Sequence, residues 1–577
     1  MTTTETTGHR FTFNLLDDPW LPCLVPSGGG SVRRDELGLR AVLGRAHKIT
    51  ELSIPSPLIT VALYRLLIAV AHRVFGPADA EAWWELWDAG QPDAEKLDAY
   101  LDSDALRGRF DLFDTQHPFY QVASLGAEYG APIAKLTHEQ ANTGNAVLLS
   151  DHGWGAAAMG LTPAEAARYL VAYQAYAVGG LISYEKGQDP KIYKSASAGP
   201  LVKGVVVLAR GDTLWETLLL NMVRYPREQW AQASGEPDRP AWERDREPTA
   251  LPRYPAGYLD LLTWQSRRVH LFPETDERGR VVVKRAAAMK GHPFPPGFER
   301  RAIEAMTPFT HNEKAKTAEG QDPYPPLVFR DERALWRDSA TLLATTDKSW
   351  RPATLGWLDE LGLRRRLKRK ALPLDALGMR SDQAKVLAWH HERLAVPLDY
   401  LDKHNEHNAE LFEGLGIAVG LADRVGRALR DGVRELAKLL IASEADHRST
   451  RQPLPADVNG LAESLGVERV YWTALDEPFA RFLMELPATS QGTPFEDHAR
   501  DALDSWATEL RGAANGAFEG AIAGLDTSAR ALKAAALGQR AQRAFVAKAL
   551  GVYGRPRGSD TGDQESSVDN TPATVPA

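Results

Sequence analysis

Two short clusters of histidine and glutamate are the residues whose types could hold a metal ion. His404, His407 and Glu410 follow at three-residue intervals and would share one face of a helix. Residues 390–392, His-His-Glu, form the second cluster. Neither matches HExxH or another metal signature. We therefore favour solvated polar residues and predict no metal site, although a hydrolase using the first cluster stays as an alternative.

A basic run at residues 364–370 is the strongest local concentration of charge. It reads RRRLKRK in a chain with a formal net charge of −8. One interpretation is a solvated helix face, as most charge runs are. The other is contact with nucleic-acid phosphates. We favour phosphate contact by Arg364, Arg365 and Arg366, because the run itself contains no compensating acid.

A helix start is predicted just after this run. Ser381 or Asp382 could cap a helix that continues through Gln383 and Ala384 to Trp389. A plain capped helix is one interpretation. The other is that the helix N-terminus faces phosphates or base edges, with the Gln383 side chain free to insert.

Catalytic motifs give no positive support for an enzyme. The chain has no GxSxG, no P-loop and no GxGxxG opening a helix, and the glycines at 28–30 predict a turn. No cofactor is predicted. Cys23 is the only cysteine, which excludes an intramolecular disulfide and a cysteine-based zinc knuckle. No secretory signal is recognised in residues 1–10, so we expect a reducing, cytoplasmic location.

The composition predicts a folded protein with a substantial core. The 577 residues are 44% hydrophobic and include 15 tryptophans. The longest apolar stretch, residues 58–75, contains Arg65, His72 and Arg73, so it predicts a buried helix and not a membrane span. Thr162, Pro163 and Glu165 predict a capping box for a helix that stops at Gly179.

The carboxy-terminal third predicts a helical bundle. Four Ala/Leu-rich amphipathic segments span residues 408–442, 461–486, 495–523 and 528–550. Short breaks between them favour an antiparallel four-helix bundle. The predicted class is α+β, with a mixed α/β domain at 1–400, the bundle at 401–554 and a disordered tail at 555–577. Residues 201–208 predict a strand.

Several strings, each weak alone, occur in the order known from one protein family. They are FNLLDDPWLP at 13–22, FDLFDTQHPF at 110–119, RGDTLWETLLLN at 210–221, PAWE at 240–243, LTWQSRR at 262–268 and RALWRD at 333–338. Over roughly residues 11–550 the chain resembles CasA, the large-subunit family of the type I-E CRISPR surveillance complex, Cascade.

The resemblance implies a non-catalytic subunit that works with nucleic acid. CasA proteins bind other Cascade subunits beside the 5′ handle of the CRISPR RNA. They read the protospacer-adjacent motif (PAM) of double-stranded DNA from the minor groove and help to open the duplex into an R-loop. They also form the docking platform for a recruited helicase-nuclease. A protein-bridging scaffold without direct DNA readout is the alternative, and we expect no membrane contact.

The resemblance also implies individual site residues. The family's glutamine wedge corresponds to Gln383, flanked by Asp382 and Ala384, and Asp382 could accept from a guanine amino group. The minor-groove lysine finger corresponds best to Lys290, with Lys314 or Lys316 as rivals.

The loops of the family correspond less closely. The glycine loop lies between residues 179 and 200. We assign it to Ala196, Ser197, Ala198 and Gly199, because small residues allow a close approach. The RNA-handle loop corresponds to residues 142–155, including Asn145, Leu148 and Leu149. Leucine replaces the family's aromatic residue there, so base stacking is not expected. Residues 275–279 replace a cysteine cluster of some relatives, so no zinc is expected.

Overall fold

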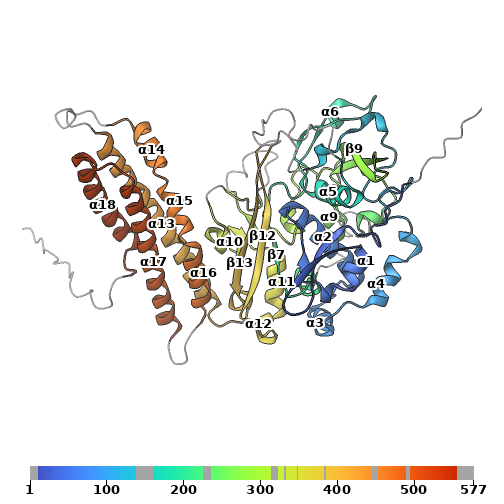
Figure 1. Cartoon of the computed structure of the whole chain (residues 1–577). Helices are drawn as coiled ribbons and strands as arrows, with labels where there is room; N and C mark the ends of the chain where they lie inside the picture. The colour runs from blue at the N-terminus through green and yellow to red at the C-terminus, as the bar shows by residue number, and fades with distance from the viewer. Residues whose placement is uncertain are drawn as a thin grey trace, which may run out of the picture. The chain divides into compact units, whose positions relative to one another are not determined.

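The computed structural model describes residues 11–137, 160–224, 235–312, 323–330, 333–346, 348–382, 385–442, 453–488 and 494–554. The chain divides into two compact units, Met1–Asn408 (unit 1) and Ala409–Ala577 (unit 2). Unit 1 mixes helices and strands, whereas the described elements of unit 2 are helices (Figure 1). The predicted α+β class, with a helical carboxy-terminal part, is confirmed.

The strands of unit 1 form several small sheets. They are β1 Leu21–Pro26, β2 Val32–Leu37, β3 Glu51–Leu52, β4 Ala131–Pro132, β5 Gly180–Leu181, β6 Ser195–Ala196, β7 Val206–Ala209, β8 Arg267–Thr275, β9 Val281–Lys290, β10 Phe309–Thr310, β11 Ser349–Trp350, β12 Ala371–Asp382 and β13 Lys385–Pro397. The three-stranded sheets have the orders β2-β1-β3, β4-β9-β8 and β13-β12-β7.

The described residues of unit 1 also form α-helices. They are α1 Leu39–Gly44, α2 Pro57–Phe75, α3 Ala80–Ala89, α4 Ala94–Leu101, α5 Pro163–Tyr176, α6 Pro190–Tyr193, α7 Leu214–Asn221, α9 Tyr258–Leu262, α10 Ser339–Leu343, α11 Ala353–Leu361 and α12 Leu363–Arg366. Short 3₁₀ turns connect several of them.

Helix α2 is the central core helix of unit 1. Ser56 caps its N-terminus and Pro57 occupies the first turn. By length and composition it is the one described helix that could cross a membrane, but 78% of that stretch is buried inside the structure. The predicted buried helix is confirmed.

Helix α5 begins as predicted. The Thr162 hydroxyl accepts from the backbone N–H of Glu165, and the Glu165 carboxylate accepts from that of Thr162. The helix ends at Tyr176 and not at Gly179, because the carbonyls of Ala177 and Val178 turn aside to accept from the Arg267 guanidinium. The predicted strand is also shorter, since Leu201 still bonds back to α5 and β7 begins only at Val206.

Unit 2 contains α13 Asn408–Ile441, α14 Pro455–Ser464, α15 Val467–Thr473, α16 Asp476–Glu485, α17 Phe495–Ala523 and α18 Ala529–Leu550. Helices α13, α17 and α18 match three of the four predicted segments. The single helix predicted at 461–486 was wrong, because α14, α15 and α16 occupy that region. Gly466 adopts a left-handed conformation at φ +63° and separates α14 from α15. The tail at 555–577 lies outside the described residues.

Candidate nucleic-acid interface

A long β-hairpin occupies the region where the sequence predicted a capped helix. Asp382 ends β12 and pairs with Lys385, the first residue of β13, so Gln383 and Ala384 are the two residues between the strands. These two lie outside the described residues. The helix prediction was wrong because residues 385–389 pair with the end of β12, which β7, far away in sequence, holds in a sheet. The candidate wedge therefore occupies the connection of a hairpin and not a helix N-terminus.

One face of the hairpin, which carries His390 and Glu392, is held by contacts from other segments. The His390 ring stacks on Phe329 with 4.6 Å between centroids. The Glu392 carboxylate accepts from the backbone N–H of Leu335 at 2.6 Å. At Gly378, a Cβ atom would lie 2.8 Å from the carbonyl oxygen of Gly204, so only glycine allows this approach. The second histidine cluster thus has a structural role in the hairpin.

Lys290, the candidate lysine finger, is the last residue of β9. Its Nζ atom donates to the carbonyl of Ile192 at 2.7 Å. Partial burial lowers the pKa of Lys290 below its ordinary value. This contact ties the end of β9 to helix α6. The rival residues Lys314 and Lys316 lie outside the described residues.

The candidate glycine loop lies next to Lys290. Ser197, Ala198, Arg267 and Lys290 line the same small pocket. The buried Arg267 guanidinium donates to the carbonyl of Ser197 at 2.9 Å and so fixes the loop. At Gly199 a Cβ atom would lie 2.6 Å from the carbonyl of Ala175, so the tight turn requires glycine. The structure thus brings two separately predicted sites together.

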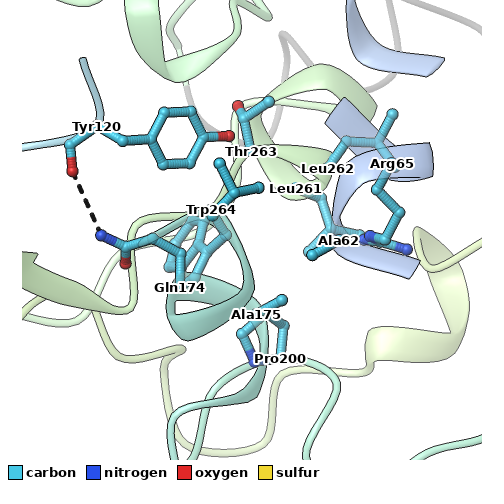
Figure 2. Close-up of a pocket in the computed structure, with 11 residues that line it drawn as sticks. Ala62, Arg65, Tyr120, Gln174, Ala175, Pro200, Leu261, Leu262, Thr263 and Trp264 are labelled. Atoms are coloured by element: carbon cyan, nitrogen blue, oxygen red, sulfur yellow. Dashed lines mark hydrogen bonds between the residues drawn. The ribbon is translucent and has the colours of Figure 1, made fainter. Parts of the chain in front are cut away.

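A buried polar residue fixes the neighbouring strand β8. The amide of Gln174 on α5 donates to the carbonyl of Arg267 and accepts from its N–H, both at 2.9 Å. Figure 2 shows Gln174 beside Tyr120 and Trp264 at a small cavity that Arg65 also lines. The cavity measures about 10 Å³, room for about one water molecule. The cavity is therefore too small for a ligand larger than water, and the role of Gln174 is to hold β8.

His292, two residues after Lys290, makes this region sensitive to acid. Burial and then the Arg253 guanidinium lower the pKa of His292 to about 4, from an ordinary value of 6.5. The unfolded chain thus takes up the proton first as the pH falls. The stabilising contribution of neutral His292 is complete above pH 6.5 and is lost progressively toward pH 4.

We expect His292→Phe to lose stability less steeply than the unaltered chain between pH 6.5 and pH 4. Urea unfolding midpoints across this range measure the difference. His117→Phe, at an exposed histidine, is the control and should leave the slope unchanged. Parallel curves for His292→Phe and the unaltered chain would contradict the assignment.

The basic run is paired with acids from distant parts of unit 1. Arg364 forms an ion pair with Asp399 at 2.9 Å, and Arg366 forms one with Asp88 at 2.8 Å. Arg366 also covers the ring of Trp84. Phosphate contact by Arg364, Arg365 and Arg366 stays a prediction, and two of these arginines would have to exchange a carboxylate partner for a phosphate.

The remaining predicted sites divide into two groups. Asn145, Leu148 and Leu149 of the RNA-handle loop lie outside the described residues. His404 and His407 precede α13 and share no helix face with Glu410, so that part of the prediction was wrong. Among the described residues, no group of three or more His, Cys, Asp and Glu side chains could hold a metal ion.

Comparison with known proteins shows the class of this chain. The family model described as CRISPR-associated protein Cse1 matches residues 14–517. The chain is 34% identical over 546 residues to CRISPR-associated protein CasA/Cse1 of Thermus thermophilus, covering 92% of this chain and 96% of that protein.

Solved structures of CasA and Cse1 proteins match the fold of this chain. The crystal structure of Thermus thermophilus CasA is 30% identical, with a TM-score of 0.72, and the match covers 93% of this chain and 100% of that one. Cse1 from Acidimicrobium ferrooxidans is 27% identical, with a TM-score of 0.73 and coverage of 94% and 99%. The chain belongs to the Cse1 (CasA) family of type I-E Cascade, as its sequence strings predicted.

Proposed function

We propose that this chain is the non-catalytic Cascade subunit that recognises the PAM in double-stranded DNA from the minor groove. It then promotes duplex opening and R-loop formation. The observation that carries the proposal is the meeting of Lys290 with the loop of Ser197 and Ala198 at one surface pocket. A cationic side chain next to small residues suits a narrow groove, because the backbone can approach and the cation can reach base-edge acceptors.

The hairpin supplies the second part of the proposed function. Its two connecting residues, Gln383 and Ala384, lie between the paired strands β12 and β13, and a wedge on such a hairpin can enter the first base pair beside the PAM. Contact with the CRISPR RNA 5′ handle and docking of a helicase-nuclease complete the proposal. Family membership supports these two roles.

Lys290→Ala tests the proposal. In the assembled, RNA-loaded complex, we expect affinity for a PAM-bearing duplex to fall about ten- to a hundredfold, because a hydrogen bond to a charged group contributes about 1.5–3 kcal/mol. Equilibrium binding on intact and pre-opened duplexes measures the effect, which should appear on both. Lys96→Ala, at a lysine with 70% side-chain exposure on α4, is the control and should bind normally. Unchanged PAM affinity for Lys290→Ala would favour the scaffold alternative.

A further inference from the structure

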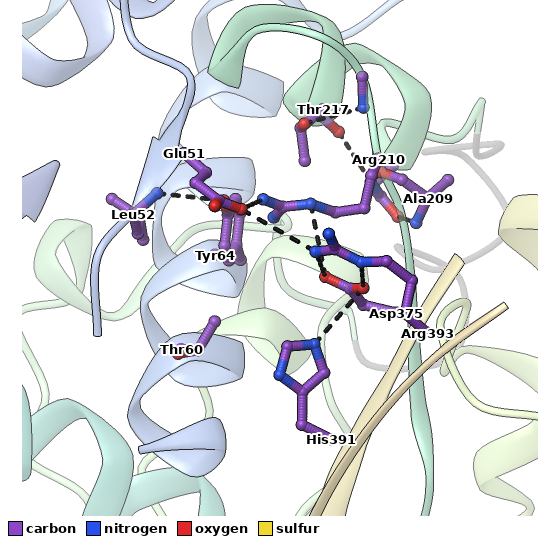
Figure 3. Close-up of polar contacts among 12 residues, drawn as sticks. Glu51, Leu52, Thr60, Tyr64, Ala209, Arg210, Thr217, Asp375, His391 and Arg393 are labelled. Atoms are coloured by element: carbon purple, nitrogen blue, oxygen red, sulfur yellow. Dashed lines mark hydrogen bonds and ion pairs between the residues drawn. The ribbon is translucent and has the colours of Figure 1, made fainter. Parts of the chain in front are cut away.

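The base of the hairpin contains a buried carboxylate held by two arginines and a histidine. Asp375 on β12 is 3% exposed. Its two oxygens accept from Arg393, the facing residue of β13, at 2.6 and 3.0 Å. Nε of Arg210, directly after β7, lies 3.5 Å from Asp375, and Nε2 of His391 lies 3.4 Å away (Figure 3). Asp375 therefore joins both hairpin strands to the end of β7.

The same cations connect the hairpin to the core of unit 1. Arg210 also forms an ion pair with Glu51 on β3, and its guanidinium lies 5.0 Å from the ring centroid of Tyr64 on α2. Arg393 lies 4.0 Å from the same Glu51 carboxylate. Figure 3 shows these side chains converging from α2, β3, β7 and the hairpin. We call Glu51, Arg210, Asp375 and Arg393 the hairpin joint.

The charges of the hairpin joint balance one another. Two carboxylates face two guanidinium groups. Burial alone would raise the pKa of Asp375, but the hydrogen bonds from Arg393 and the charge of Arg210 outweigh it and lower that pKa. The carboxylate is therefore ionised at neutral pH. These residues line a cleft of about 340 Å³. Because each charge is neutralised by another member of the group, the arrangement indicates a structural joint and not a ligand site.

Because the hairpin joint lies near one end of the hairpin, a small change of angle there moves the connection at the other end by a larger distance. Pairing of β12 with β7 ends at Leu377, so among the described residues the sheet beyond this point consists of β12 and β13, with the His390–Phe329 stack opposite Gly378 as a side-chain contact. Asp375 lies about 23 Å along the strand from Asp382, at ~3.3 Å per residue. A rotation of about 5° at Asp375 would displace the far end by about 2 Å, enough to misplace a side chain that must enter a base step.

We propose that Asp375 and Arg393 are positioning residues that aim the hairpin, and with it Gln383, at the first base pair beside the PAM. This inference rests on the proposed function of the hairpin. The residues touch no DNA themselves. Their effect is on the rate of duplex opening, because they fix the angle of the arm.

Asp375→Asn tests the inference in the assembled complex. It keeps the shape of the side chain but removes its charge. We expect R-loop formation on an intact linear duplex to slow about tenfold. PAM affinity, and R-loop formation on a target already mismatched beside the PAM, should stay normal. Hydrogen exchange of the amides in residues 371–397 should accelerate, because the arm is less firmly held.

Two further variants keep this test decisive. Arg393→Gln alters a half-exposed residue, leaves the Arg210–Asp375 pair in place, and serves if Asp375→Asn does not fold. Glu243→Gln is the matched control, since Glu243 is a mostly buried carboxylate that accepts from two atoms of Arg73 away from the hairpin. It should not affect R-loop formation.

The outcomes separate this inference from the proposed function. If Gln383→Ala slows opening of intact duplexes but the folded joint variants do not, the hairpin joint has no positioning role and the wedge remains. Equal slowing by a joint variant on intact and pre-opened targets would also overturn the inference. If neither Gln383→Ala nor the joint variants slow opening, the wedge function itself is wrong.

Discussion

Replacing Gln383 by alanine is expected to slow R-loop formation on an intact linear duplex about tenfold, equivalent to ~1.4 kcal/mol of activation free energy. Separating one base step costs a few kcal/mol. A glutamine that enters the vacated space offsets part of this cost, whereas the alanine methyl group is too short to do so. Time-resolved R-loop formation by the assembled complex measures the effect.

The state of the target DNA provides the control for Gln383→Ala. On negatively supercoiled DNA, or on a target mismatched beside the PAM, opening is easier and the variant should approach the rate of the unaltered chain. Initial PAM binding should be retained, in contrast to Lys290→Ala. Equal slowing on intact and pre-opened targets would refute the wedge role.

Local sequence signals predicted those elements whose stability is itself local. Thr162, Pro163 and Glu165 specify a capping box through contacts within one turn, and the structure forms it. Residues 58–75 are apolar apart from a few polar positions such as Arg65 and His72, which suits a helix surrounded by other elements. The amphipathic segments that became α13, α17 and α18 carry their own apolar stripe. In each case the residues that decide the structure lie close together in the sequence.

The hairpin shows where this reasoning fails. Ser381, Asp382 and the apolar residues up to Trp389 satisfy the rules for a capped helix. The strand pattern is hidden because most of these residues lie on β13, where the exposed positions include the apolar Leu387 and Trp389, so polar and apolar residues do not alternate along the sequence. Pairing with β12 decides the conformation, and β12 is in turn held in a sheet by β7, far away in sequence.

Charge pairing was equally hidden from the sequence. The basic run contains no acid, yet Arg364 forms an ion pair with Asp399 and Arg366 forms one with Asp88. The hairpin joint, whose members extend from Glu51 to Arg393, gave no sequence signal at all. In contrast, the pairing of Lys290 with the Ser197 loop was implied in two pieces by the family resemblance, and the fold brings the pieces together.

A buried ion pair beneath the proposed interface should have the largest effect on stability. Arg65 on α2 and Glu304 are 3% and 6% exposed, and the guanidinium donates to both carboxylate oxygens, at 2.8 and 3.0 Å. Burial disfavours the charge of Arg65, but Glu304 more than compensates and raises the pKa of Arg65 above its ordinary value. Arginine is not deprotonated in proteins, so Arg65 keeps its charge when the carboxylate of Glu304 is removed.

Glu304→Gln is therefore expected to lower the free energy of unfolding by about 3–5 kcal/mol, because it leaves the charge of Arg65 buried without a counterion. Urea unfolding of the full chain, followed by tryptophan fluorescence, measures the loss. Asp104→Asn removes one partner of the exposed Arg107–Asp104 pair, with side chains 82% and 93% exposed, and should unfold like the unaltered chain. The double variant Arg65→Met with Glu304→Gln should recover much of the loss, since no unpaired charge then remains. If Glu304→Gln unfolded at the same urea concentration as the exposed control, Glu304 would not be the buried counterion that Arg65 requires.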